Sequence, residues 1–243
     1  MNTKHTLEQM LELKLYGMAK SYETQLNQPA QQQPDGHTLI AMLTEAEAHS
    51  REHQRTNLYL RLAKLRYMVH PEQIKCSPER NLTKEQLRFL SEVAFIENAE
   101  NVLITGATGC GKSYLACALG NRACTLGYKT IYYSMNRFIE ILATARIDGS
   151  YIKLLNMIAK TPLLILDDFG LQPVDHNTRL TLLQILEDRY KKNSIIITSQ
   201  LPVKDWYEHI GDPTLADAIM DRLTASMHKV ELKGDSLRKQ KNV

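Results

Sequence analysis

Apolar residues recur at helical spacing through the first part of the chain. Between residues 6 and 26 they fall every three or four positions, at Leu7, Leu11, Leu15, Met18, Tyr22 and Leu26. This spacing predicts one amphipathic helix. The stretch NQPAQQQPDG ends that helix, because prolines, a run of glutamines and Asp-Gly favour neither helix nor strand. A second, longer helical pattern then runs from Thr38 to about Met68.

After residue 83 the pattern alternates between short apolar, β-branched runs and helical stretches. The runs that predict strands are NVLIT, KTIYYS, LLILD, SIIITS and HKVEL. Strands that alternate with helices are typical of a parallel sheet covered by helices on both faces. The stretch TKEQLRFLSEV, with Thr83 as the cap and Gln86 at the capping-box position, predicts the first helix of this part.

These patterns predict three parts of the chain. Residues 1–70 are expected to form a small all-α domain, and residues 71–82, with prolines at 71 and 78, to form a linker. Residues 83–243 are expected to form an α/β domain with a five-stranded parallel sheet. No internal repeat is visible.

Composition restricts the possible partners and the cellular location of the protein only weakly. The net charge of +3, from 30 basic and 27 acidic residues, permits a nucleic-acid partner without requiring one. The four cysteines form no CxxC pair, and three of them fall in or just after the glycine-rich loop described below, which favours a reducing cytoplasm. The N-terminus lacks the apolar core of a signal peptide, and no window approaches the roughly 18 apolar residues of a membrane span. We therefore expect a cytoplasmic protein with no membrane partner.

The segment GATGCGKS matches the phosphate-loop pattern of Gly, four residues, Gly-Lys and Ser or Thr. Glycines let backbone N–H groups turn around phosphate oxygens, and the helix that follows adds the positive end of its dipole. Lys112 is expected to reach the β- and γ-phosphates of ATP, and Ser113 to bind Mg²⁺. The alternative is an ordinary glycine turn, which the preceding strand and following helix disfavour. The expected nucleotide contacts are Gly106, Ala107, Thr108, Gly109, Cys110, Gly111, Lys112, Ser113 and Tyr114.

Two other strand ends carry candidate chemistry. The run TPLLILDDFG predicts a strand buried on both faces that ends in Asp167 and Asp168, beside the phosphate loop. Asp167 is expected to hold Mg²⁺ through water, and Asp168 to orient or activate the attacking water. Taken alone, two aspartates after an apolar run more often begin a loop. Ser199 and Gln200, after SIIIT, are candidates to reach the γ-phosphate, and the alternative is a turn before Pro202.

Basic residues elsewhere fit two tasks. Arg222, in LADAIMDRLTASM, is a candidate to stabilise the γ-phosphate of a neighbouring subunit, and Arg238, in GDSLRKQ, that of its own; for each alone a solvated arginine is the alternative. Residues 51–66 contain five basic side chains and a single acid, Glu52. This local excess of positive charge makes the segment the best candidate to bind duplex DNA, and the alternative is a solvated helix face. The five basic residues are Arg51, Arg55, Arg61, Lys64 and Arg66.

With the phosphate loop, LLILDDFG, IIITSQLPV, DAIMDRL and GDSLR in this order, the sequence resembles the IstB-type transposition helper ATPases. These belong to the AAA+ class of P-loop ATPases and are related to the DnaC-type helicase loaders. The resemblance extends to LELKLYGMAKSYETQ and EAHSREHQRTNLYLRLAK near the N-terminus, so it covers nearly the whole chain.

The resemblance implies an ATPase that assembles on duplex DNA as a helical or ring-like homo-oligomer, remodels the DNA, and recruits and stimulates a partner transposase. It also implies roles for single residues. Arg222 matches the trans-acting arginine finger, Gln200 with Ser199 matches the first sensor, and Arg238 matches a second sensor. Arg137, Arg146 and Lys153 lie in the helical insertion that related initiators turn toward DNA.

Two departures from the wider class qualify these expectations. Asp168 stands where most AAA+ proteins have glutamate, which predicts slow turnover that awaits a partner. The 21 residues after Arg222 are too few for a full C-terminal helical lid. Three alternatives stay open: a DnaC-type helicase loader, a small-molecule phosphotransferase, and a DNA scaffold that binds ATP without hydrolysing it.

Overall fold

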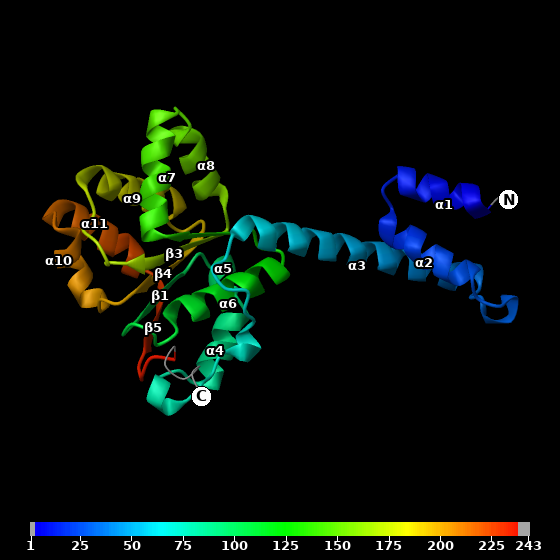
Figure 1. Ribbon diagram of the computed structural model, residues 1–243, viewed down its shortest axis with the longest axis horizontal. Coiled ribbons are helices and arrows are strands. Elements are labelled where there is room, and N and C mark those ends of the chain that lie inside the picture. Colours follow the sequence, from blue (N-terminus) through cyan, green and yellow to red (C-terminus); the bar gives the residue numbers. More distant parts are fainter. Residues whose placement is uncertain (1–2, 238–243) are drawn as a thin grey trace. The chain divides into compact units, whose positions relative to one another are not determined.

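The computed structural model describes residues 3–237, apart from the side chain of Ala30. The chain divides into two compact units, Met1–Leu58 and Tyr59–Val243 (Figure 1).

The first unit is helical and contains α1 (Thr3–Glu12), α2 (Tyr16–Leu26), the short turn η1 (Ala30–Gln32) and most of α3 (Gly36–Ala63). The single helix predicted over residues 6–26 is two helices, because Lys14 adopts a left-handed conformation (φ 60°) that ends α1. Glu47 of α3 then caps α2: its Oε2 accepts the backbone N–H groups of Gly17 and Met18 at 2.8 and 3.2 Å.

Gly17 is required at the contact between α2 and α3. A Cβ atom built there would lie 2.3 Å from the carbonyl oxygen of Ala46, so any side chain would push the two helices apart. The helix pair therefore rests on a glycine contact and a buried carboxylate cap, neither of which the apolar spacing indicated.

The second unit contains a five-stranded parallel sheet in the order β2-β3-β4-β1-β5. All five predicted strands are confirmed, and so is the α/β class. The strands are β1 (Asn101–Gly106), β2 (Thr130–Ser134), β3 (Leu163–Phe169), β4 (Ser194–Ser199) and β5 (Met227–Leu232). Because all strands run the same way, their carboxyl ends meet at one edge, which is where parallel α/β sheets place their sites.

Helices cover both faces of the sheet (Figure 1). One core cluster joins the sheet to the helices α4, α5 and α6, and the other joins it to the helices α7 to α11. The alternation is visible in β1, where Val102 and Ile104 belong to the first cluster and Leu103 to the second. The helices are α4 (Lys84–Ser91), α5 (Ala94–Glu97), α6 (Lys112–Thr125), α7 (Met135–Ile147), α8 (Tyr151–Lys160), α9 (His176–Arg189), α10 (Trp206–Ile210) and α11 (Pro213–Thr224).

The segment expected to be a linker, residues 71–82, packs instead within the second unit. Ile74 and Leu82 are buried in the core cluster that includes α6, and Val69 joins them there. The prolines at 71 and 78 stand at the starts of the short helical turns η2 (Pro71–Gln73) and η3 (Pro78–Arg80), a position that proline favours. The boundary between the units therefore falls inside α3, ahead of the expected position.

Thr83 caps α4 as predicted, with its hydroxyl oxygen 3.0 Å from the N–H of Gln86. After β5, residues 233–237 form no helix. Within residues 3–237, no helix has the length and apolar character needed to cross a membrane.

Candidate functional site

The phosphate loop between β1 and α6 has the backbone that its glycines permit. Gly106, Gly109 and Gly111 have φ values of 147°, 83° and 96°, which residues with side chains rarely adopt. No described residue accepts a hydrogen bond from the N–H groups of Gly109, Gly111, Lys112 and Ser113. These free donors lie at the positive end of the α6 dipole and form a cradle suited to phosphate oxygens.

Lys112 is folded back onto this loop. Its side chain is buried, and Nζ donates to the carbonyl oxygens of Gly106 and Ala107, both at 2.9 Å. The ammonium group therefore lies within the loop, from which it can reach phosphate oxygens held by the free N–H groups.

Asp167 is the most densely bonded carboxylate of the site. It is fully buried, and it accepts hydrogen bonds from the hydroxyl groups of Ser113 at 2.8 Å, Tyr132 at 2.5 Å, and Thr198. Because Ser113 and Asp167 offer a hydroxyl and a carboxylate oxygen within one hydrogen bond of each other, the pair fits a hard cation such as Mg²⁺. Burial and the bond to Asp167 raise the pKa of Tyr132, so the phenol remains a donor.

Asp168 faces the cavity next to Asp167. Its backbone is left-handed (φ 63°), and its N–H donates to the Thr198 hydroxyl at 3.0 Å. Burial raises the pKa of Asp168, the charge of Asp167 raises it further, and the positive charge of Arg66 opposes both. Arg66 Nη1 lies 3.3 Å from Asp168 Oδ2.

Beside these groups lies a cavity of about 580 Å³, at the carboxyl edge of the sheet. The phosphate loop and Asp168 line it, and Gln200 joins them through a 2.7 Å hydrogen bond from the Thr108 hydroxyl. Ile74 also lines the cavity, and so do Tyr67 and Tyr114, whose rings lie 5.7 Å apart. A cavity that combines phosphate-binding groups with aromatic and apolar side chains suits a nucleotide.

Two contacts fasten neighbouring segments to the phosphate loop. Arg80 donates from Nη2 to the Cys110 carbonyl oxygen at 2.8 Å and also bonds to the carbonyl of Lys75. On the other side, the N–H of Leu237 donates to the Gly109 carbonyl oxygen at 3.0 Å.

Cys110 has a structural explanation. Its side chain is buried in the core cluster beneath the loop, and its Sγ would lie 2.9 Å from a Cβ atom on Gly106. A small, weakly polar side chain fits this space.

Ser199 does not line the cavity. The Ser199 hydroxyl is buried and donates to the carbonyl of Phe169 at 2.6 Å, so it supports the turn after β3 and not the cavity wall. Arg238 lies outside the described residues.

Arg222 lies at the opposite edge of the sheet from the phosphate loop. Its backbone carbonyl accepts a hydrogen bond from Asn101, the first residue of β1, whereas the loop follows the last residue of that strand. The guanidinium donates to Glu187 at 2.9 Å and to the carbonyl of Ala218 at 2.9 Å. Arg222 therefore takes no part in the cavity of its own chain.

The basic residues assigned to DNA separate into groups. In the first unit, Arg51 is exposed and pairs with Glu47 at 2.7 Å, and Arg55 is exposed. In the second unit, Arg61 and Lys64 are exposed, whereas Arg66 lines the nucleotide cavity. The contact with Asp168 thus gives Arg66 a partner that the sequence analysis did not foresee.

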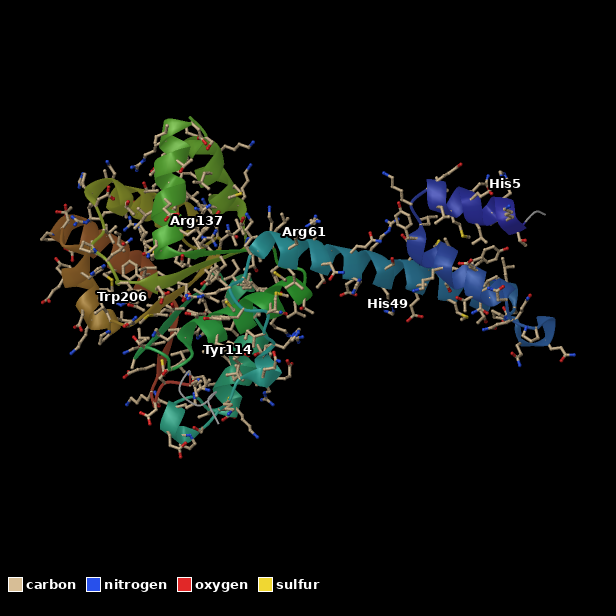
Figure 2. All side chains as sticks on the ribbon, viewed as in Figure 1. His5, His49, Arg61, Tyr114, Arg137 and Trp206 are labelled. Atoms are coloured by element: carbon tan, nitrogen blue, oxygen red, sulfur yellow. The ribbon has the colours of Figure 1, made fainter. Side chains whose placement is uncertain are left out.

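The second group of basic candidates is also mixed. Arg137 pairs with Glu140 at 2.8 Å, and Lys153 is exposed (Figure 2 shows Arg137 on α7). Arg146 bonds to the Thr181 hydroxyl at 2.7 Å and lies over the ring of Tyr151, so it joins helices.

Several residues of the site were not predicted from the sequence as part of it. Tyr132 and Thr198, which bond to Asp167, lie on strands that flank β3, and the parallel register that brings them to Asp167 follows only from the strand order. Arg66, Tyr67 and Arg80 line the cavity, but they precede the α/β pattern, in the segments expected to form the helical domain and the linker. No local signal assigned any of these residues to a nucleotide site.

A family model provides the decisive comparison: the model described as IstB-like ATP binding protein matches residues 8–243. The chain belongs to the IstB-like ATP-binding family. The insertion sequence ATP-binding protein y4pL of Sinorhizobium fredii (strain NBRC 101917 / NGR234) is 41% identical over 234 residues, which cover 96% of each chain. The ATP-binding protein of insertion sequence IS21 from Pseudomonas aeruginosa is 31% identical over 235 residues, covering 96% of this chain and 89% of the relative.

Solved structures place this IstB-like chain among AAA+ folds. AMPPCP-bound DnaA from Aquifex aeolicus gives a TM-score of 0.60 at 24% identity, over 73% of this chain and 55% of that chain. The DnaC helicase loader gives a TM-score of 0.56 at 20% identity, over 70% of this chain and 100% of that chain. At these identities the likeness concerns the fold alone, and it confirms the expected AAA+ core.

Proposed function

We propose that this IstB-like protein hydrolyses ATP and uses the nucleotide to control its assembly on duplex DNA, where it recruits and stimulates a partner transposase. One observation carries the proposal: Ser113, Asp167 and Asp168 meet beside the free N–H donors of the phosphate loop. A phosphate cradle, a cation site and a carboxylate at the cavity wall are the parts that phosphoryl transfer to water needs.

In the proposed reaction Lys112 and the loop hold the phosphates. Ser113 and Asp167 hold Mg²⁺, which, when bound, offsets phosphate charge. Asp168 orients a water molecule whose oxygen bonds to the γ-phosphorus, while the bond from that phosphorus to the β,γ-bridging oxygen breaks. The proton of the water passes to Asp168 and then to solvent, leaving ADP and phosphate. Gln200 would act as the first sensor of the γ-phosphate, a role supported by its hydrogen bond with Thr108 of the phosphate loop.

We propose that Arg222 completes the site of a neighbouring subunit. Its location at the far edge of the sheet supports this role, because one chain cannot supply the phosphate loop and Arg222 to the same nucleotide. ATP bridging two chains would favour assembly, and hydrolysis would remove the bridge. Arg238 remains a proposed second sensor. The hydrogen bond from Leu237, the residue before it, to Gly109 of the phosphate loop supports this proposal.

We propose that duplex DNA is bound by exposed basic residues. They are Arg51, Arg55, Arg61 and Lys64, with Arg137 and Lys153 as a second surface. The family's link to insertion sequences supports a transposase as the partner. Cytoplasmic location is part of the proposal, supported by four free cysteines, three of them buried.

The test is ATP-dependent assembly on duplex DNA, measured by light scattering and sizing, with the partner transposase added in a second arm. Wild type should form large complexes with ATP, and Lys112→Ala should not. Arg222→Ala should bind ATP normally and fail to assemble. Glu187→Ala is the matched control, because it breaks the same intrachain ion pair and keeps the guanidinium.

The outcomes separate the parts of the proposal. A wild type that stays monomeric on DNA with ATP overturns the assembly role. Equal loss of assembly in Glu187→Ala and Arg222→Ala assigns Arg222 a structural role within its own chain. Assembly only with a replicative helicase, and no effect on a transposase, favours a DnaC-type loader.

A further inference from the structure

Arg66 is a cation held against both carboxylates of the nucleotide site. Its Nη1 lies 3.3 Å from Asp168 Oδ2 and 3.7 Å from Asp167 Oδ2. It belongs to neither the phosphate loop nor the strand ends, and it comes from the segment just after α3. The proposed hydrolysis has so far given it no role.

The contact involves Asp168, the carboxylate proposed to orient the attacking water. The left-handed backbone of Asp168 and its N–H bond to Thr198 hold this residue at the end of β3, where its Oδ2 accepts a hydrogen bond from Arg66. Because Oδ2 accepts this N–H, a water molecule has to compete with the guanidinium for that oxygen. The ion pair thus hinders Asp168 from holding the attacking water.

The pair is also easy to break. The Arg66 side chain is 44% exposed, and ion pairs with this much solvent are weak. The guanidinium carbon also lies 5.5 Å from the ring centroid of Tyr67, a contact that does not depend on Asp168.

The backbone beside Arg66 is a candidate DNA contact. Arg61 lies in the last turn of α3, and Lys64, two residues before Arg66, has a left-handed backbone (φ 52°) that ends the helix. Both side chains are exposed. DNA phosphates bound by these two residues would lie close to Arg66 in the chain and would attract its guanidinium.

We propose that Arg66 clamps Asp168 and keeps ATP hydrolysis slow until duplex DNA binds the end of α3 and draws the guanidinium away. The inference rests on the proposed function, since it presumes the water attack at Asp168 already described. Arg66 acts through Asp168 and is therefore a positioning residue.

The test compares steady-state hydrolysis at saturating ATP, with and without duplex DNA, for wild type, Arg66→Ala and Arg66→Lys. Without DNA, Arg66→Ala should turn over about tenfold faster than wild type, and added DNA should change its rate little. Arg66→Lys keeps the charge and should stay slow without DNA. Arg88→Ala, an exposed arginine of α4 that does not line the nucleotide cavity, is the matched control and should behave as wild type.

The separate values of kcat and KM supply a readout that a structural role would not move in this way. Removing the guanidinium frees Asp168 Oδ2 and leaves the phosphate loop unchanged, so Arg66→Ala should raise kcat at an unchanged KM for ATP, and Arg88→Ala should change neither. A DNA-free rate of Arg66→Ala at or below that of wild type overturns the clamp and leaves hydrolysis intact. Absence of hydrolysis in every variant, Arg66→Ala included, overturns both the clamp and the proposed hydrolysis.

Discussion

The Tyr132 hydroxyl lies 2.5 Å from Asp167 Oδ2 and joins β2 to the end of β3. On the other oxygen, Oδ1, Asp167 accepts hydrogen bonds from Ser113 and Thr198. The aspartate is thus held from both flanking strands and from the first turn of α6. Such supporting bonds orient a metal ligand and tune its affinity.

Tyr132→Phe tests this support. We expect the Mg²⁺ concentration for half-maximal ATP binding to rise by about tenfold, because outer hydrogen bonds to a metal ligand are worth this much. Fluorescent-nucleotide binding titrated with Mg²⁺ measures it. Tyr133→Phe is the control, since Tyr133 is the next residue of β2 and packs against Phe138 instead. An equal shift in both variants would contradict the assignment.

The strands and the phosphate loop could be predicted from short sequence patterns. Each β-branched run became a strand, and the Gly-rich segment became a loop that opens a helix, because strand alternation, glycine backbone freedom and capping act over a few residues. The meeting of Ser113 and Asp167 was predictable for another reason: in a parallel sheet, the carboxyl ends of the strands and the loops that follow them meet at one edge.

Contacts between distant segments could not be predicted in this way. Arg66 and Asp168 are 102 residues apart, and a basic residue beside other basic residues indicated DNA. The start of α2 is capped by Glu47 of another helix, and the packing of residues 71–82 depends on the core cluster that includes α6. These features follow from tertiary packing, which overrides local propensity.

Asp168→Asn tests the electrostatics of the cavity. Burial and the neighbouring Asp167 raise the pKa of Asp168, so the native state holds this proton more tightly than the unfolded chain does. The contribution of Asp168 to stability is therefore fully present below its unfolded pKa of about 3.9 and is lost as the pH rises through the folded pKa.

Near pH 7 we expect Asp168→Asn to raise Tm by about 1–3 °C, an effect that asparagine's tolerance of a left-handed backbone assists. The gain should disappear as the pH falls below the unfolded pKa. Melting curves from pH 3 to 8 measure it, with Asp217→Asn, on the exposed face of α11, as the control. A gain that does not vary with pH would show that charge is not the cause.

Arg189 holds the amino edge of the sheet together. Its buried guanidinium donates to the carbonyl groups of Ile158, Thr161, Pro162 and Ser194. Arg189→Ala should lower the free energy of unfolding by about 3 kcal/mol, because it leaves these buried acceptors without their donor. Urea unfolding measures the loss, and Lys192→Ala, an exposed neighbour, should change it by less than about 0.5 kcal/mol. Equal effects would refute the role.

Glu47→Gln tests the cap that joins α2 and α3 in the first unit. The bond from Arg51 lowers the pKa of Glu47, and the N–H groups of Met18 and Gly17 lower it further against the effect of burial. The folded carboxyl releases its proton more readily than the unfolded one. Its stabilisation is therefore present above the unfolded pKa of about 4.3 and is lost as the pH falls through the folded pKa.

At pH 7 we expect Glu47→Gln to destabilise the first unit by about 1–2 kcal/mol, since the side chain is only 9% exposed and its hydrogen bonds are charge-assisted. Hydrogen exchange of the amides in α2 and α3 measures this loss within the first unit. Glu45→Gln, an exposed carboxylate on the same helix, should leave exchange unchanged. The difference between the two variants should shrink as the pH is lowered toward 3, because protonation then removes the same charge from wild type. A difference that persists at low pH would assign the effect to packing instead of the carboxylate cap.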